Sequence, residues 1–216
     1  MRPADDAFSG PPSDCGLCPR LAAFRADNRA RNPGWHNRPV PPFGPLNAPI
    51  LIVGLAPGLK GANASGRPFT GDGAGELLYP TLLAFGLARG VYRARLDDGL
   101  ELTGCRITNA VRCVPPANRP LPAEEAACRP FLAREIAAMP ALKAILALGG
   151  IAHKAVLDAL GIRKSAVPFI HGQRYRLDNG VLLADSYHCS RLNTNTGRLT
   201  EAMFHAVFAG LTGKMD

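Results

Sequence analysis

Residues 50–61, ILIVGLAPGLKG, begin with four consecutive apolar residues and continue as a glycine-rich loop. An apolar run of this length, followed by turn residues, predicts a buried strand in an α/β sheet. Open α/β sheets bind ligands at the carboxyl ends of their strands, where glycine lets backbone N–H groups approach closely. The stretch therefore predicts an α/β fold with a candidate ligand-binding loop, although a tight structural turn explains the glycines equally well.

The rest of the chain repeats this alternation of short apolar runs with amphipathic stretches. Strands are predicted at 50–53, 106–111, 144–148 and 181–185. Helices are predicted at 75–88, 123–139, 151–160 and 199–210, and Asn179-Gly180 predicts a hairpin turn. Residues 1–47, rich in Pro, Arg and Asn, are expected to form an ordered arm with a short helix around 21–28. We expect one three-layer αβα domain over residues 1–216, with a central and mostly parallel sheet.

Charge and hydropathy limit the classes of partner. Lys and Arg outnumber Asp and Glu by 25 to 17, which gives a formal net charge of +8. That excess favours a polyanionic partner or an anionic surface, with nucleic acid as the first candidate, over the alternative of a basic enzyme without such a partner. No apolar run approaches the roughly 20 residues that cross a bilayer, and the N-terminus lacks the pattern of a signal peptide. We expect a cytoplasmic protein with no membrane partner. In the loop at 54–61 no second glycine is followed by Lys and then Ser or Thr, as a Walker A motif requires, which disfavours a nucleoside triphosphatase.

Four of the six cysteines fall into two pairs. Cys15 and Cys18 form a Cys-x-x-Cys motif near the N-terminus, and Cys113 and Cys128 flank a proline-rich loop. In a reducing compartment such cysteines are metal ligands or reactive thiols rather than disulfides. Four thiolates suit either zinc or an iron-sulfur cluster, and their spacing does not distinguish the two.

Four polar or aromatic residues are candidates for a site. Phe69 lies among small, flexible residues, which suits a ring presented in a pocket, whereas the local sequence makes Asp72 first of all a helix cap. Asn109 ends a predicted strand, where its amide offers the donor and acceptor needed to read a base edge. His188 follows a strand and precedes a polar loop that suits phosphate contacts. The other four histidines are interpreted as ordinary surface or core residues.

These features occur together in one known family. Residues 54–58, 67–75, Asn109 and 188–198 have the order and approximate spacing of the motifs of the uracil-DNA glycosylase superfamily. Their combination resembles its type-B (family 5) branch, and the similarity extends from Cys15 to about Ala206. The resemblance implies a DNA-repair glycosylase.

The resemblance also implies roles for the residues of the pocket. Gly54, Ala56 and Gly58 would face the sugar and position water, Phe69 would stack on a flipped base, and Asn109 would read its Watson–Crick edge. His188 would stabilise the departing base anion. Other branches carry a carboxylate or amide at the positions of Leu55 or Ala56. Since this chain has neither, the resemblance assigns the orientation of water to Asp72, a role that can coexist with capping.

DNA and cofactor contacts follow from the same resemblance. Ser190, Arg191 and Leu192 would enter the minor groove, with Leu192 filling the vacated stack, and Arg198 would contact phosphate. The layout of Cys15, Cys18, Cys113 and Cys128 is similar to that of family 4 and 5 enzymes, which implies a 4Fe-4S cluster. Cys105 is expected in the core, and Cys189 in a loop.

The expected reaction is hydrolysis of the bond between a damaged base and deoxyribose, leaving an abasic site. Uracil-specific relatives have a tyrosine where this chain has Gly58, so a roomier pocket is expected to accept hypoxanthine, xanthine and ethenocytosine as well. The enzyme is expected to be a monomer. Two alternatives stay open: a non-catalytic protein that holds a damaged base in the same pocket, and a zinc-stabilised phosphoesterase, for which no His and Asp ligand cluster is found.

Overall fold

A five-stranded sheet forms the centre of the computed structural model, which describes residues 10–213. Its order is β4 (Cys105–Asn109), β1 (Ile50–Gly54), β5 (Ala144–Leu148), β7 (Leu182–Ser186) and β6 (Arg174–Arg176). The first four strands are parallel, and β6 runs antiparallel to β7. Gly54 pairs with Asn109 at the carboxyl ends of β1 and β4, so the loops that follow these strands leave the sheet at one edge.

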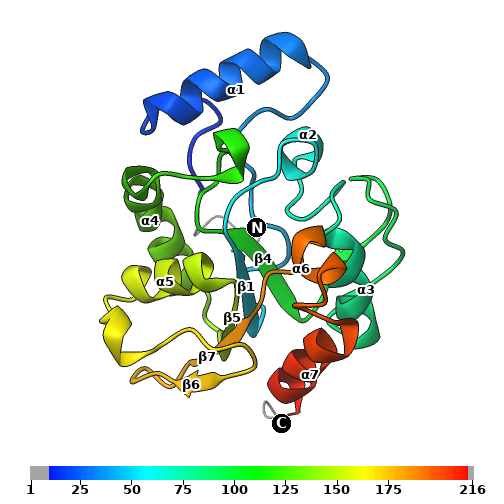
Figure 1. Cartoon of the computed structure of the whole chain (residues 1–216), viewed down its shortest axis with the longest axis vertical. Coiled ribbons are helices and arrows are strands. Elements are labelled where there is room, and N and C mark those ends of the chain that lie inside the picture. Colours follow the sequence, from blue (N-terminus) through cyan, green and yellow to red (C-terminus); the bar gives the residue numbers. More distant parts are fainter. Residues whose placement is uncertain (1–9, 214–216) are drawn as a thin grey trace, which may run out of the picture.

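Helices cover both faces of this sheet and complete the three layers that were predicted (Figure 1). Alternate residues of β1 point to opposite faces: Ile50 and Ile52 pack with α3 (Gly75–Ala84) and α7 (Glu201–Thr212). Leu51 and Val53 pack with α4 (Pro122–Ala137) and α5 (Gly150–Ala159). Because β1 is buried on both faces, its sequence is a continuous apolar run.

Helix α3 is shorter than expected, since the prediction of a helix over 75–88 is wrong at its end. Gly86 adopts a left-handed φ of 68°, and the N–H of Leu87 donates to the carbonyl of Leu82. This is the hydrogen-bond pattern with which glycine ends a helix. Ala88 then belongs to a two-stranded sheet, β2 (Ala88–Arg89) with β3 (Glu101–Leu102).

Other boundaries differ less. The predicted strand at 106–111 occupies Cys105–Asn109, and the predicted arm helix extends over α1, Pro19–Arg31. The hairpin predicted at Asn179-Gly180 joins β6 to β7, with Gly180 at a left-handed φ of 82°. Short elements complete the described fold: α2 (Ala62–Ser65), η2 (Pro116–Asn118), η3 (Lys164–Ala166) and α6 (Arg191–Asn195).

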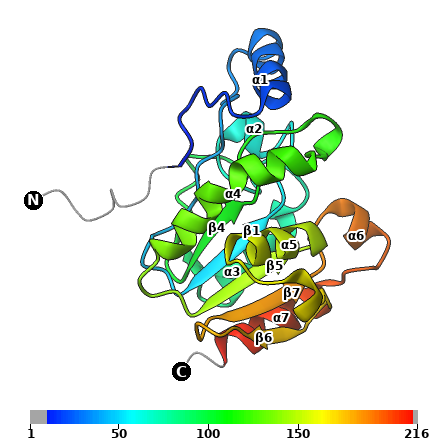
Figure 2. The ribbon, with the colours of Figure 1, turned by 90° about the vertical axis from the view of Figure 1, so that its left-hand side faces the viewer.

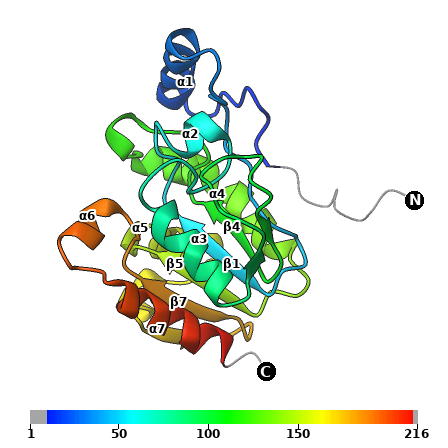
Figure 3. The same ribbon diagram turned by 90° about the vertical axis from the view of Figure 1, so that its right-hand side faces the viewer.

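The arm docks on the core along its described part, whereas residues 1–9 of the predicted arm lie outside the described residues. Val40 N–H donates to the carbonyl of Arg112, and Phe43 forms a bridge with Ile107 of β4. Leu21 of α1 packs with Val111 and Phe131. Figures 2 and 3 show α1 at one end of the molecule, beyond α2 and far from α7. Within residues 10–213, no helix is both long and apolar enough to cross a bilayer.

Candidate active site

A pocket of about 720 Å³ opens beyond the carboxyl ends of β1 and β4. This is the edge at which open α/β sheets bind ligands. The pocket brings together nine of the residues predicted from the sequence: Ala56, Gly58, Phe69, Asp72, Asn109, His188, Ser190, Arg191 and Leu192. They come from four separate stretches of the chain, so the fold assembles the predicted site.

Gly54 and Arg198 lie outside the lining of this pocket. A Cβ atom on Gly54 would lie 2.5 Å from Oδ1 of Asn109 and 2.6 Å from Cζ of Phe69. Glycine is therefore needed at position 54 so that Asn109 and Phe69 can take their places. The guanidinium of Arg198 lies over the ring of Tyr187, 4.7 Å from its centroid.

The ring of Phe69 forms one wall of the pocket and lies beside the imidazole of His188. The ring centroids are 5.8 Å apart and the planes are inclined by 29°. Phe69 has a φ of 53°, in the left-handed region of the backbone that residues other than glycine rarely adopt. Backbone strain of this kind is concentrated at functional sites, where surrounding contacts maintain it.

The two carboxylate oxygens of Asp72 have different surroundings: one accepts a backbone hydrogen bond and the other faces the pocket. Oδ1 accepts a hydrogen bond of 3.1 Å from the N–H of Ala74. Oδ2 faces the first loop, since a Cβ atom on Gly61 would lie 2.4 Å from it and one on Gly58 3.1 Å from it. The N-cap of α3 is Ala74, so the interpretation of Asp72 as the cap residue is wrong. Asp72 still orders the turn before the helix, with Oδ2 at the pocket.

The side chains of His188 and Asn109 offer hydrogen-bonding groups that have no partner among the described residues. Burial lowers the pKa of His188 below its ordinary value, although the Asp72 carboxylate opposes this effect. A neutral imidazole has one N–H donor. Asn109 is 3% exposed, and neither its amide nor the imidazole of His188 hydrogen-bonds to another described residue. Both groups are therefore free to contact a ligand.

The loop after His188 brings a bulky apolar residue to the mouth of the pocket. Ser190 is the N-cap position of α6, and Leu192 in its first turn is 75% exposed. Asn193 Nδ2 donates to the carbonyl of His188 over 2.8 Å, which ties this loop to the pocket. Arg191 pairs with Glu76 of α3 over 3.0 Å at the surface. An exposed leucine beside an arginine suits insertion into a nucleic-acid groove.

Asn118 also lines the pocket, although the sequence did not single it out. It lies in the loop between Cys113 and α4, where Ala117 and Asn118 have left-handed φ angles of 53° and 55°. Pro115 and Pro116 marked this loop as a turn, but they could not show that it reaches the pocket.

The other histidines lie outside the pocket, as expected. His153 is buried, with Nδ1 2.7 Å from Oδ1 of Asp185 and Nε2 2.8 Å from the carbonyl of Val167. This carboxylate and carbonyl raise the pKa of His153 despite its burial. His171 stacks on Tyr187 with ring centroids 4.7 Å apart. These rings have structural partners, which agrees with their interpretation as ordinary residues.

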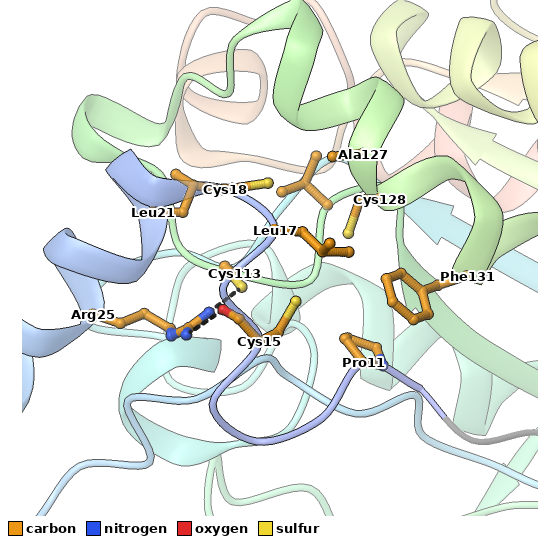
Figure 4. A pocket seen from close by; sticks show the side chains of 11 residues that line it. Pro11, Cys15, Leu17, Cys18, Leu21, Arg25, Cys113, Ala127, Cys128 and Phe131 are labelled. Atoms are coloured by element: carbon orange, nitrogen blue, oxygen red, sulfur yellow. Dashed lines mark hydrogen bonds between the residues drawn. The ribbon is translucent and has the colours of Figure 1, made fainter.

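A second, smaller pocket is lined by the four cysteines predicted to bind metal (Figure 4). Cys15 and Cys18 come from the arm, Cys113 from the loop after β4 and Cys128 from α4. Burial is the main cause that raises the pKa of three of these thiols, Cys18, Cys128 and Cys113, the last to about 11. In residues 10–213 no group of three or more His, Cys, Asp or Glu side chains is placed to hold a metal ion. Cys105 and Cys189 are buried in the main core instead.

Arginine and backbone donors surround this second pocket. The Nη1 of Arg25 donates to Sγ of Cys113 over 2.8 Å, and its Nη2 donates to the carbonyl of Cys15 over 2.8 Å. The N–H of Arg112 donates to Sγ of Cys128 over 3.4 Å. Leu21, Val111 and Phe131 supply apolar walls. The four thiols thus lie in a sheltered site with hydrogen-bond donors to sulfur.

Comparison with known proteins gives a consistent result. Residues 41–212 match the model of the uracil DNA glycosylase superfamily. A type-5 uracil-DNA glycosylase of Thermus thermophilus is 47% identical over 205 residues, which cover 92% of this chain and 93% of that protein. One of the same type from Pyrobaculum aerophilum is 42% identical over 87% of this chain and 83% of its own length. A type-4 enzyme of the latter organism is 35% identical over 66% of this chain and 65% of its own.

Proposed function

Because the chain belongs to the uracil-DNA glycosylase superfamily, we propose that it is a type-5-like DNA glycosylase that removes uracil from DNA. The observation that carries this proposal is the convergence of Phe69, Asp72, Asn109 and His188 on one pocket. The net charge of +8 agrees with a DNA partner. We further propose that the enzyme acts as a cytoplasmic monomer.

Base recognition would use the unpartnered groups of the pocket. The N-glycosidic bond is inaccessible inside a duplex, so the nucleotide must first leave the stack, at a cost of a few kcal/mol. Stacking on Phe69 would return about 1–3 kcal/mol of this cost. The Asn109 amide can donate to one uracil oxygen and accept from the adjacent N–H.

Cleavage would be assisted at both ends of the breaking bond. As in glycoside hydrolysis, the sugar gains positive charge while the leaving group takes the electron pair of the bond. The neutral His188 N–H can donate to the oxygen of the uracil anion, and Asp72 Oδ2 can accept a hydrogen bond from the attacking water. Water oxygen bonds to the sugar carbon, and the proton that it loses balances the charge of the released base.

A non-catalytic protein that holds a damaged base is the alternative, because Leu55 and Ala56 put no acid into the first loop. Asp72 is the single carboxylate among the described residues that line the pocket. A gel assay on a uracil-containing duplex, with alkali to break the abasic product, separates the two functions. Cleavage supports the glycosylase, and binding without cleavage supports the alternative.

We propose a broad base range, which includes hypoxanthine, xanthine and ethenocytosine, on the basis of Gly58. Gly58→Tyr is expected to reduce hypoxanthine release relative to uracil release by at least roughly tenfold, because a ring at this position narrows the pocket. Single-turnover rates on duplexes that carry uracil, hypoxanthine, xanthine or ethenocytosine measure this ratio and the rest of the base range. Gly58→Ala is the control, since its Cβ makes the same 3.1 Å approach to Asp72 Oδ2 without a ring. Strict uracil specificity of the wild type, or an unchanged range in Gly58→Tyr, would refute the proposal.

We propose that Leu192 fills the gap left by the flipped nucleotide. Leu192→Ala is expected to lower activity on a fully paired duplex by about tenfold and to change activity on single-stranded DNA little, since only the duplex needs its stack refilled. Parallel rate measurements on the two substrates test this. Leu96→Ala is the matched control, because Leu96 is 63% exposed but lines a different pocket. Equal losses on both substrates would mean that Leu192 is no wedge.

We also propose that Cys15, Cys18, Cys113 and Cys128 hold a 4Fe-4S cluster. Three features of the site fit such a group: four thiols around one pocket, apolar walls, and N–H donors to the sulfur atoms of Cys113 and Cys128. Burial raises the pKa of Cys113 and Cys128, and the cations Arg25 and Arg112 oppose this effect because positive charge stabilises a neighbouring thiolate. Since base hydrolysis transfers no electrons, the cluster would be structural and would fix the arm to the loop after β4.

A further inference from the structure

We infer that Arg67 and Asp98 are positioning residues that hold the Phe69 ring in its stacking orientation. The inference rests on the proposed function, because it assumes that a base stacks on Phe69. It assigns a part in base recognition to Asp98 and Tyr92, two residues of the 90–100 loop that lie outside the sequence motifs. The first observation behind it is the left-handed φ of 53° at Phe69, a conformation that needs support from neighbouring residues. A bulky residue keeps this conformation only where its surroundings enforce it.

A buried ion pair anchors the turn that carries Phe69. Arg67 Nη1 and Nη2 donate to Oδ1 and Oδ2 of Asp98 over 2.9 and 2.7 Å, and Arg67 Nε donates to Oγ1 of Thr70 over 2.7 Å. The side chains of Arg67 and Asp98 are 3% and 0% exposed. Arg67 thus joins both ends of the turn at 67–70 to the 90–100 loop. Its bidentate pair with Asp98 fixes the orientation of the two side chains as well as their distance.

Aromatic rings enclose the guanidinium of this pair. Its central carbon lies 5.2, 5.4 and 5.8 Å from the ring centroids of Phe43, Tyr79 and Tyr92. Such rings attract a cation through their faces, but they cannot accept hydrogen bonds as a carboxylate does. Removal of the Asp98 charge would leave the buried Arg67 cation without its counter-ion. The guanidinium of Arg67 would then shift toward other hydrogen-bond acceptors or solvent, and the turn at 67–70 would shift with it.

Two tyrosine hydroxyls and one glycine fix the peptide groups beside the strained residue. Tyr79 donates to the carbonyl of Pro68 over 2.5 Å, and Tyr92 donates to the carbonyl of Phe69 over 3.3 Å. Helix α3 begins against the same carbonyl, since a Cβ on Gly75 would lie 1.9 Å from it. The Phe69 peptide is therefore clamped between α3 and the 90–100 loop. Asp98 also accepts from the N–H groups of Arg93 and Leu100, so it holds that loop in shape.

The test separates base stacking from DNA binding. Two duplexes are compared: one carries a non-hydrolysable uracil nucleotide, and the other carries an abasic analogue at the same position. Asp98→Asn is expected to weaken binding to the uracil duplex by roughly tenfold, as loss of a stacking contact does, and binding to the abasic duplex less than about twofold. Tyr92→Phe keeps the ring and removes the hydroxyl, so it should shift the same ratio by a smaller factor.

Two further single variants and one double variant complete the design. Asp97→Asn makes the same charge change one residue away, in an exposed pair with Arg95, and should alter neither affinity. Phe69→Leu should reproduce the Asp98→Asn pattern, and the double variant should lose less than the product of the two single losses, because both act on one contact. If Asp98→Asn does not fold, the ratio of the two duplex affinities of Tyr92→Phe tests the inference in its place.

Equal loss on both duplexes, or wild-type affinity of Asp98→Asn and Tyr92→Phe for both, would overturn the inference. A wild-type protein that prefers neither duplex would instead count against the proposed function.

Discussion

Asp72→Asn is expected to lower the single-turnover rate of uracil release by a factor on the order of ten to a thousand, while affinity for DNA stays near that of the wild type. The side-chain oxygen of Asn can still accept from the N–H of Ala74, so the turn before α3 keeps its hydrogen bond. What is lost is the negative charge and basicity of Oδ2 at the pocket. Rates at saturating enzyme, with melting curves of both proteins, measure the two effects separately.

Asp158→Asn is a matched control for this change. Asp158 pairs with Arg129 and Lys164 at the surface, and its neutralisation should leave the rate unchanged. A near wild-type rate for Asp72→Asn, with unchanged melting, would remove Asp72 from the chemistry. Asn118, which lines the same pocket, would then be the next candidate to position the water.

The parallel strands were the part of the fold that the sequence predicted best. The strand at 144–148 was predicted with its observed bounds, and those of β1 and β7 differ by one residue at most. Strands buried on both faces are apolar throughout, so a local pattern identifies them. The hairpin turn implied a strand before Asn179, but the bounds of β6 were not predicted, because Arg174-Tyr175-Arg176 is polar and only partly buried and its pairing with β7 sets its conformation. The end of α3 had a local signal, Gly86, which the prediction passed over.

The site was predicted through its resemblance to a family and not through physical pattern alone. Local sequence favoured a capping role for Asp72, and only the fold shows its second oxygen facing the first loop. The pairing of Arg67 with Asp98 joins residues 31 positions apart, a separation that no local pattern encodes. Asn118 reaches the pocket through two consecutive left-handed residues, neither of them glycine, which propensities would not suggest.

Cys113→Ala is expected to abolish iron binding, as measured by metal analysis, acid-labile sulfide and visible absorbance of anaerobically purified protein. Cys113 is chosen because it follows β4 and its Sγ accepts the Arg25 hydrogen bond that links α1 to the core. Without the cluster, α1 would be fixed to the core by the apolar contacts of Leu21 and by the ion pair of Arg20 with Glu124 of α4. Since metal binding adds directly to the free energy of folding, the melting temperature of Cys113→Ala should be lower than that of the wild type by roughly 10 °C.

Hydrogen exchange locates this loss of stability. Backbone amides of α1 should exchange faster in Cys113→Ala, whereas those of β1 and β5 should change little, because the cysteine pocket does not form part of their core. Cys105→Ala is the control: Cys105 is buried in the main core, so its removal should cost some stability and leave iron in place. Full iron content in Cys113→Ala, or stoichiometric zinc without iron and sulfide in the wild type, would contradict the assignment. In the zinc case the same four thiols would still tie the arm to the core, and the exchange pattern would persist with a different metal.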